Sequence, residues 1–106
     1  VADRDAKTKK TLPVKNLNEL EFIRGEIWAN VWQTTKIVRI DPKTGNVIGW
    51  IDCSGFVPKE YENEHRRPAF ERNNVLNGIA FDPATNHVFI TGKNWSVLYK
   101  IHVVDP

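Results

Sequence analysis

Cysteine and methionine are almost missing from this chain of 106 residues, which has one cysteine and no methionine. A single cysteine excludes an intrachain disulfide, and the apolar segment around Cys53 predicts a buried thiol rather than a reactive one. Pairing of Cys53 with a cysteine outside these residues stays open. The chain also begins at Val1 without an initiating methionine, so we expect it to be the C-terminal part of a longer protein.

The chain also lacks long apolar runs and an excess of charge of one sign. No stretch approaches the roughly 18 apolar residues of a membrane helix, so we expect no membrane partner. The 15 basic and 13 acidic residues are interspersed and leave a net charge of +2, a pattern without the basic stripe that nucleic acid requires. Three histidines, His65, His87 and His102, share no ligand-like spacing with each other or with Cys53. We therefore expect neither a metal nor another cofactor.

The chain contains, however, an internal repeat. Residues 17–22 read LNELEF, and residues 76–81 read LNGIAF, 59 residues later in the same frame. A turn follows each phenylalanine, and apolar pairs then correspond, IW at 27–28 and VF at 88–89. Repeated units of this kind stack to bury a shared core.

Each copy is expected to form short antiparallel strands. The expected strands are 17–22, 26–33, 36–41 and 47–53 in the first copy, and 76–81, 87–92 and 97–102 in the second. The segment DPKTGN at 41–46 is a turn, because proline presets φ and glycine permits a positive φ. A repeat of roughly 40 to 60 residues with four short strands is typical of a propeller blade. The fold class is therefore all-β, a β-propeller.

This chain would supply about two blades, 17–53 and 76–102, and residues 1–15 would end a preceding one. All of 1–106 would then be the C-terminal part of a single propeller domain. The charged segment 54–75 between the blades is expected to be an exposed insertion, and the alternative is a lid whose Arg67 or Phe70 touches a ligand. Two blades leave open faces and strand edges, so the chain alone should be unstable.

Antiparallel pairing around the first turn predicts which residues share an end of the inner strands. If Phe22 lies opposite Ile27, an uninterrupted ladder places Leu17 opposite Trp32. The same counting places Asn18 opposite Val31, Phe81 opposite Val88, Asn77 opposite Gly92 and Leu76 opposite Lys93.

Four residues at these strand ends are the candidate site, because the inner strands of a propeller line its channel. They are Asn18, Trp32, Asn77 and Lys93. The position of Trp32 in the first copy is occupied by Lys93 in the second. A core position rarely alternates with lysine, which argues against a core role for Trp32, whereas Trp28 is expected in the core. An alternative for Asn18 and Asn77 is that both cap local backbone at the start of a strand.

Five segments also carry a resemblance to a known family. They are LNELE at 17–21, GEIWANVWQT at 25–34, GWI at 49–51, LNGIA at 76–80 and TGK at 91–93. They closely resemble the plant and bacterial type of glutaminyl-peptide cyclotransferase (glutamine cyclotransferase), and the likeness extends over residues 14–101. That family is a five-bladed β-propeller, which agrees with the repeat.

The resemblance implies an acyltransferase that converts the N-terminal glutamine of a peptide or protein to pyroglutamate and releases ammonia. The family's pattern places catalytic roles on Asn18 and Lys93 and a substrate-binding role on Trp32, to which the repeat adds Asn77. Trp32 would offer an apolar wall, Asn18 would hold the amide or ammonium, and Lys93 would favour negative charge on the carbonyl oxygen. The family also implies the secretory pathway, extracellular or periplasmic, and a partner in the remaining N-terminal part of the propeller.

One family residue and two alternatives bear on this hypothesis. The family's acid/base glutamate, in an FTEGL-type segment of an earlier blade, has no counterpart here, and Glu19, Glu21 and Glu26 lie outside that motif. A non-catalytic propeller that binds a peptide or small ligand would explain Trp32 but gives no special reason for Lys93. A hydrolase or lactonase propeller would need a metal cage of carboxylates and histidines, which these strands do not supply.

Overall fold

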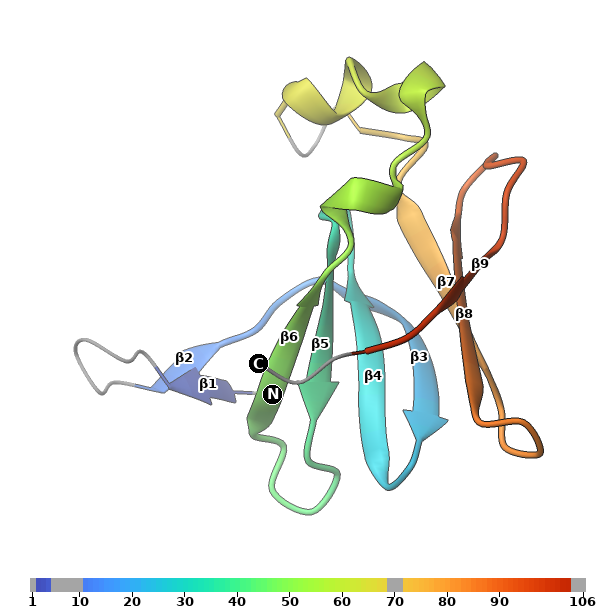
Figure 1. Cartoon of the computed structure of the whole chain (residues 1–106). Helices are drawn as coiled ribbons and strands as arrows, with labels where there is room; N and C mark the ends of the chain where they lie inside the picture. Colours follow the sequence, from blue (N-terminus) through green and yellow to red (C-terminus); the bar gives the residue numbers. More distant parts are fainter. Residues whose placement is uncertain (1, 5–10, 69–71, 104–106) are drawn as a thin grey trace.

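The computed structural model describes residues 2–4, 11–68 and 72–103 (Figure 1). These residues form three antiparallel sheets, which confirms the all-β part of the predicted fold class. A hairpin pairs β1 (Ala2–Arg4) with β2 (Thr11–Pro13). The four-stranded sheet runs in chain order through β3 (Leu17–Ile23), β4 (Glu26–Val31), β5 (Lys36–Ile40) and β6 (Val47–Asp52). The three-stranded sheet contains β7 (Leu76–Asp82), β8 (His87–Gly92) and β9 (Tyr99–Ile101).

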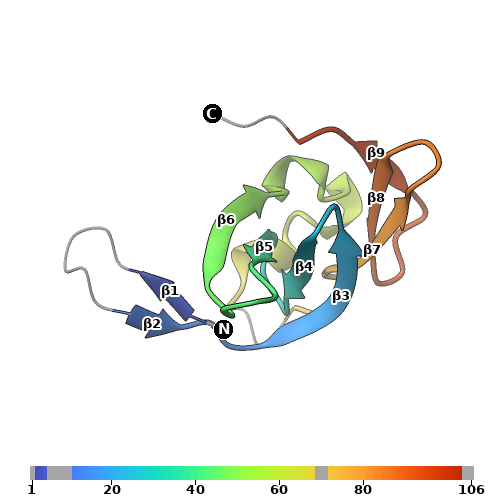
Figure 2. The same ribbon diagram turned by 90° about the horizontal axis from the view of Figure 1, so that it is seen from below.

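The two repeat copies correspond to the two larger sheets. β7 lies beside β3 and β4, and Figures 1 and 2 both show the three-stranded sheet on that side. No fourth strand follows β9 in the residues described up to 103. The β1–β2 hairpin extends away from both sheets in the two views, and the indole Nε1 of Trp50 in β6 donates to Asp3 Oδ2 at 2.9 Å.

A β-bulge changes the predicted register at the start of β3. Leu17 pairs with Val31 and not with Trp32, because β3 accommodates one extra residue between Leu17 and Leu20. The predicted pair of Asn18 with Val31 is wrong for the same reason. An extra residue bends its strand and redirects the side chains around it, so Asn18 leaves the regular ladder.

The same bulge recurs in β7. Leu76 pairs with Gly92 and not with Lys93, and the irregularity lies between Leu76 and Ile79. The predicted pair of Asn77 with Gly92 is therefore also wrong. Nearer the turns the prediction is confirmed, with Phe22 opposite Ile27 and Phe81 opposite Val88.

The main core lies between the two larger sheets. Trp28 is 2% exposed there and packs with residues of both sheets, as predicted. Cys53 follows β6 directly and is also buried, and burial raises the pKa of its thiol to about 11. The prediction of a buried thiol is confirmed, and a raised pKa disfavours the reactive thiolate. A smaller apolar cluster belongs to the four-stranded sheet, namely Ala29, Val38 and Ile40.

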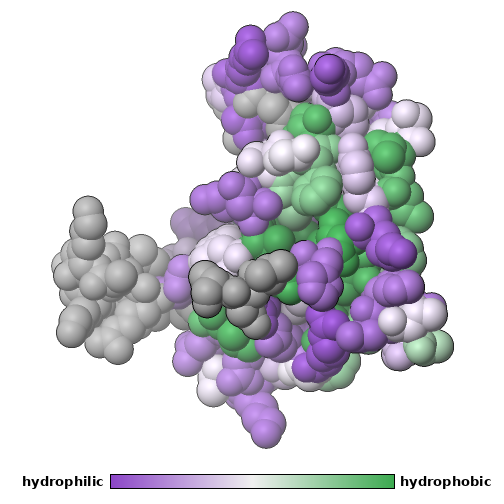
Figure 3. Space-filling model, viewed as in Figure 1, coloured by the Kyte–Doolittle hydropathy of each residue, from purple (hydrophilic) through white to green (hydrophobic). Residues whose placement is uncertain are grey.

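The described part of segment 54–75 contains three short 3₁₀ helices, where only an exposed insertion was expected. These are η1 (Ser54–Phe56), η2 (Lys59–Tyr61) and η3 (Glu64–Arg66). Figure 1 shows this insertion at the end of the sheets where β3 and β7 begin, and Figure 3 shows a largely hydrophilic surface there. Phe70, named above as a possible ligand contact, lies outside the described residues. Helices in the described part are all far too short to cross a membrane.

Candidate active site

Three of the four predicted site residues line one hollow at the insertion end of the sheets. The hollow has a volume of about 420 Å³ and is lined by Asn16, Leu17, Asn18, Trp32 and Lys93. Asn18 lies at the start of β3, whereas Trp32 follows β4 and Lys93 follows β8. Folding therefore brings together side chains from distant parts of the sequence.

The fourth predicted residue, Asn77, is placed differently. It lies in the bulge of β7, is half-buried, and is not among the residues that line the hollow. Its Oδ1 atom is buried and has no hydrogen-bond partner within the described structure.

Trp32 and Lys93 occupy equivalent positions in the two sheets, as the repeat indicated, although the register that suggested it was wrong. The Trp32 N–H donates to the carbonyl of Asn16 at 2.8 Å, and the Lys93 N–H donates to that of Val75 at 2.9 Å. Asn16 and Val75 directly precede the two repeat copies. The same backbone position thus presents an aromatic ring on one sheet and an ammonium group on the next.

A tight turn follows each of these residues and explains why β4 ends at Val31, two residues earlier than predicted. Gln33 has φ 65° and Asn94 has φ 61°. Most side chains adopt this left-handed region at a cost of about 1 to 3 kcal/mol, although asparagine tolerates it better, and such strain gathers at functional sites. Five non-glycine residues of the described chain have a positive φ, and three of them, Asn16, Gln33 and Asn94, line the hollow or adjoin its lining residues.

The lining side chains are open to solvent and differ in chemistry. Trp32 is 43% exposed, in contrast to Trp28 in the core, and Asn18 and Lys93 are exposed. An indole face packs against methylene groups, a carboxamide donates and accepts hydrogen bonds, and an ammonium group stabilises developing negative charge. The hollow therefore offers an apolar face, a hydrogen-bonding carboxamide and a cation next to one another.

Sequence reasoning missed some residues around this site. Asn16 and Leu17 line the hollow but carry no chemical signal of their own. Asn30, fully buried in β4, accepts a hydrogen bond at Oδ1 from the Gly78 N–H at 3.0 Å, and its Nδ2 has no partner in the described part. An asparagine inside an apolar strand was the available signal. Through this hydrogen bond, Asn30 joins the bulge of β7 to the four-stranded sheet.

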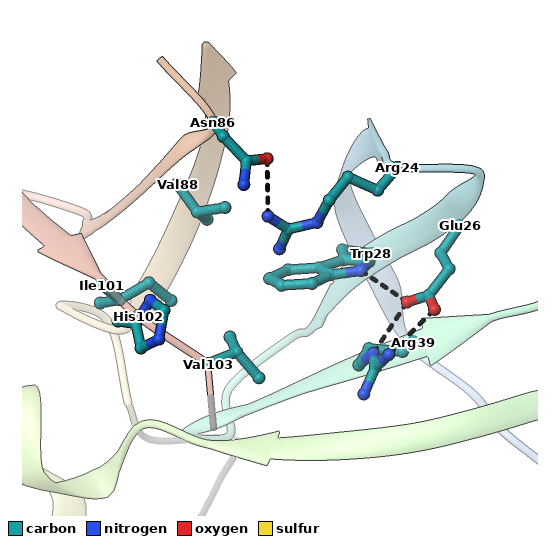
Figure 4. Close-up of a pocket in the computed structure, with 9 residues that line it drawn as sticks. All are labelled: Arg24, Glu26, Trp28, Arg39, Asn86, Val88, Ile101, His102 and Val103. Carbon is teal, nitrogen blue, oxygen red and sulfur yellow. Dashed lines mark hydrogen bonds and ion pairs between the residues drawn. The ribbon is translucent and has the colours of Figure 1, made fainter. Parts of the chain in front are cut away.

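A second hollow, of about 260 Å³, lies beside the turns at the opposite end (Figure 4). Two of its charged residues form an ion pair, in which Glu26 accepts hydrogen bonds from Arg39 Nε at 2.8 Å and Nη2 at 2.9 Å. Trp28 Nε1 also donates to Glu26, at 3.0 Å. Arg24 donates to Asn86 Oδ1 at 2.7 Å.

This network is structural. The hydrogen bond from Arg39 is the main reason that the pKa of Glu26 lies below its ordinary value, so Glu26 stays ionised and is unsuited to act as a general acid. Nowhere in the described ranges do three His, Cys, Asp or Glu side chains gather as they would around a metal ion.

The comparisons with known proteins agree with the resemblance noted in the sequence. The crystal structure of Myxococcus xanthus glutaminyl cyclase matches with a TM-score of 0.71 and 40% identity, over 88% of this chain and 39% of that chain. The glutaminyl-peptide cyclotransferase of Arabidopsis thaliana is 47% identical over 88 residues, which are 83% of this chain and 26% of that protein. The chain thus spans about a quarter of the plant relative. The glutamine cyclotransferase family model matches residues 2–103, and the chain belongs to this family.

Proposed function

We propose that this chain forms part of a glutaminyl-peptide cyclotransferase, which converts the N-terminal glutamine of a peptide or protein to pyroglutamate and releases ammonia. The observation that carries the proposal is the hollow shared by Asn18, Trp32 and Lys93. In a chain of this family, the hollow combines the apolar wall, amide and cation that the reaction needs.

The reaction joins two ends of one residue. The α-amino nitrogen attacks the side-chain amide carbon, the amide oxygen gains negative charge, and the bond to the amide nitrogen then breaks. A proton passes from the attacking amine to the departing nitrogen, which leaves as ammonia. Holding the side chain folded supplies part of the acceleration, because the reacting atoms are already close.

Each lining residue has a role in this scheme. Trp32 packs against the methylenes of the glutamine, and Asn18 holds the amide or the amino group by hydrogen bonds. Lys93 stabilises the negative charge on the amide oxygen in the transition state. Asn77 remains a proposed substrate-binding residue, supported by its unpartnered Oδ1.

The rest of the enzyme would complete the site. Proton transfer needs an acid/base carboxylate, and Glu26 is engaged by Arg39 at the opposite end of the sheets. We infer that this carboxylate comes from another part of a five-bladed propeller, which also covers the exposed Leu20 and Phe22 of the four-stranded sheet. Secretion, to the cell exterior or periplasm, is part of the same proposal.

Ammonia release from a glutaminyl dipeptide by the full-length protein tests the proposal. The matched control is the same dipeptide with an acetylated amino group, which has no nucleophile for cyclisation. We expect ammonia from the free dipeptide alone, with or without a chelator. Ammonia from both peptides would indicate an amidase, and binding of the free dipeptide without ammonia release would indicate the non-catalytic binding module.

A further inference from the structure

The insertion between the sheets contacts both turns that carry site residues. The Tyr61 hydroxyl in η2 donates to the carbonyl of Asn94 at 3.0 Å. Arg72 Nη1 donates to the carbonyl of Gln33 at 2.9 Å. Asn94 directly follows Lys93, and Gln33 directly follows Trp32. Two side chains of one segment therefore bind the same backbone position in both sheets.

These two carbonyls belong to the left-handed residues described above. Gln33 Nε2 also donates to the carbonyl of Arg72 at 3.3 Å, so the two residues exchange hydrogen bonds. Asn94 Nδ2 donates to Asn74 Oδ1 at 2.9 Å, beside the start of β7. A strained backbone persists only where its surroundings hold it. The insertion supplies contacts of that kind at both turns.

We propose that the described part of residues 54–75 acts as a positioning clamp, in which Tyr61 fixes the turn that presents Lys93 and Arg72 fixes the turn that presents Trp32. The inference rests on the proposed function. Neither Tyr61 nor Arg72 lines the hollow, so both act through their neighbours and are positioning residues. Accurate placement matters because a displacement of about 1 Å at a reacting group costs about 10²-fold in rate.

The two halves of the clamp predict different kinetic effects. Tyr61→Phe removes only the hydroxyl, and through Lys93 it should lower kcat about tenfold while KM stays within about twofold. Arg72→Ala acts through Trp32 and should raise KM about tenfold with a smaller change in kcat. If the two variants changed kcat and KM in the same way, the assignment of Tyr61 to Lys93 and of Arg72 to Trp32 would be overturned.

Each variant has a matched control in the same chain. Tyr99 is the other tyrosine, and its ring packs against Phe56 with centroids 5.0 Å apart. Tyr99→Phe should therefore keep wild-type kinetics. Arg66→Ala removes an exposed arginine of η3 and should also be silent. If Tyr61→Phe behaves like Tyr99→Phe, the clamp on Lys93 is refuted.

A double variant separates positioning from a general structural effect. If Tyr61 acts through Lys93, Tyr61→Phe should cause no further loss of kcat in a Lys93→Ala background. The same tenfold loss in that background would show that Tyr61 acts by another route, and the proposal would fail.

Amide hydrogen exchange tests the clamp independently of activity. In the full-length protein, Tyr61→Phe should accelerate exchange about tenfold at the amides of Lys93 and Trp95, which bond to the carbonyls of Val75 and Gly92. Tyr99→Phe should not. Unchanged exchange in Tyr61→Phe overturns the clamp even in an active enzyme. A wild-type protein that releases no ammonia overturns the cyclase assignment, while accelerated exchange still supports the clamp.

Discussion

Two tryptophans four positions apart in one segment lie in opposite environments. Trp28 is buried between the sheets, and Trp32 is 43% exposed beside the hollow. Trp28→Ala should therefore cost about 3 to 5 kcal/mol of unfolding free energy, as expected for a buried aromatic residue. Trp32→Ala should cost much less stability and should mainly raise KM. Chemical denaturation and steady-state kinetics of the two variants measure both effects.

The comparison depends on activity per folded molecule. If the melting temperature fell by the same amount in both variants, and Trp32→Ala retained wild-type activity per folded molecule, Trp32 would belong to the core after all.

Lys93 is expected to act on the transition state without supporting the fold. It is exposed, and its carbon stem adds little to the core. Lys93→Ala should lower kcat by about 10²-fold or more, the effect of removing one oxyanion donor, with little change in melting. Lys93→Arg should restore activity only partly, because a planar guanidinium directs its donors differently. A near-normal kcat with a raised KM in Lys93→Ala would make the lysine a binding contact instead.

At the scale of the strands, the Glu26–Arg39 pair joins the start of β4 to β5. Arg39 holds the pKa of Glu26 below its ordinary value of 4.5, so the pair stabilises the fold above that pH. This stability is lost as the pH falls through the lowered pKa, because the protonated carboxyl no longer forms the ion pair. Glu26→Gln should cost about 1 to 3 kcal/mol at pH 7 and flatten the decline in unfolding free energy below about pH 4.5.

Glu60→Gln, which changes an exposed glutamate of η2, is the control. Denaturant titrations from pH 7 to pH 3 compare the two variants. If their unfolding free energies matched throughout this range, the Glu26–Arg39 pair would contribute nothing to stability.

The strands could be predicted from the sequence, but the bulges could not. Apolar residues recur along the inner strands, and the same pattern appears in both copies of the repeat, which strengthens the prediction of strands. Counting residues from a turn assumes an uninterrupted ladder, whereas the extra residue in β7 is stabilised by Asn30 of the other sheet, which bonds the Gly78 N–H. Such a contact depends on how the sheets pack, which local patterning does not specify.

Some residues around the candidate site could likewise be predicted from the sequence, and others could not. Trp32 and Lys93 were identifiable because the repeat keeps a position and changes its chemistry there. Tyr61 and Arg72 were not, because they bind backbone carbonyls, and any residue would supply those. Their contribution follows only from the folded structure, in which the insertion contacts the turns after Trp32 and Lys93.

One face of the four-stranded sheet carries apolar residues that the described chain leaves exposed. A row of cross-strand neighbours, Leu20, Ala29, Val38 and Trp50, crosses all four strands on that face. Its two ends are open, with Leu20 57% and Trp50 43% exposed, and Phe22 lies two residues beyond Leu20 at 62%. Exposed apolar surface of this kind marks an interface or favours aggregation.

Residues 1–106 expressed by themselves are therefore expected to aggregate or to be partly unfolded and inactive. Leu20→Lys combined with Phe22→Glu should raise the monomeric fraction of this isolated chain, because the exposed face becomes polar. In the full-length protein the same pair should lower the melting temperature, because the remainder of the protein proposed above would then bury two charged side chains. Size-exclusion chromatography and thermal melting measure both effects. A wild-type 1–106 chain that is monomeric, melts cooperatively and cyclises glutaminyl dipeptides at full rate would show that no further part of the protein is needed.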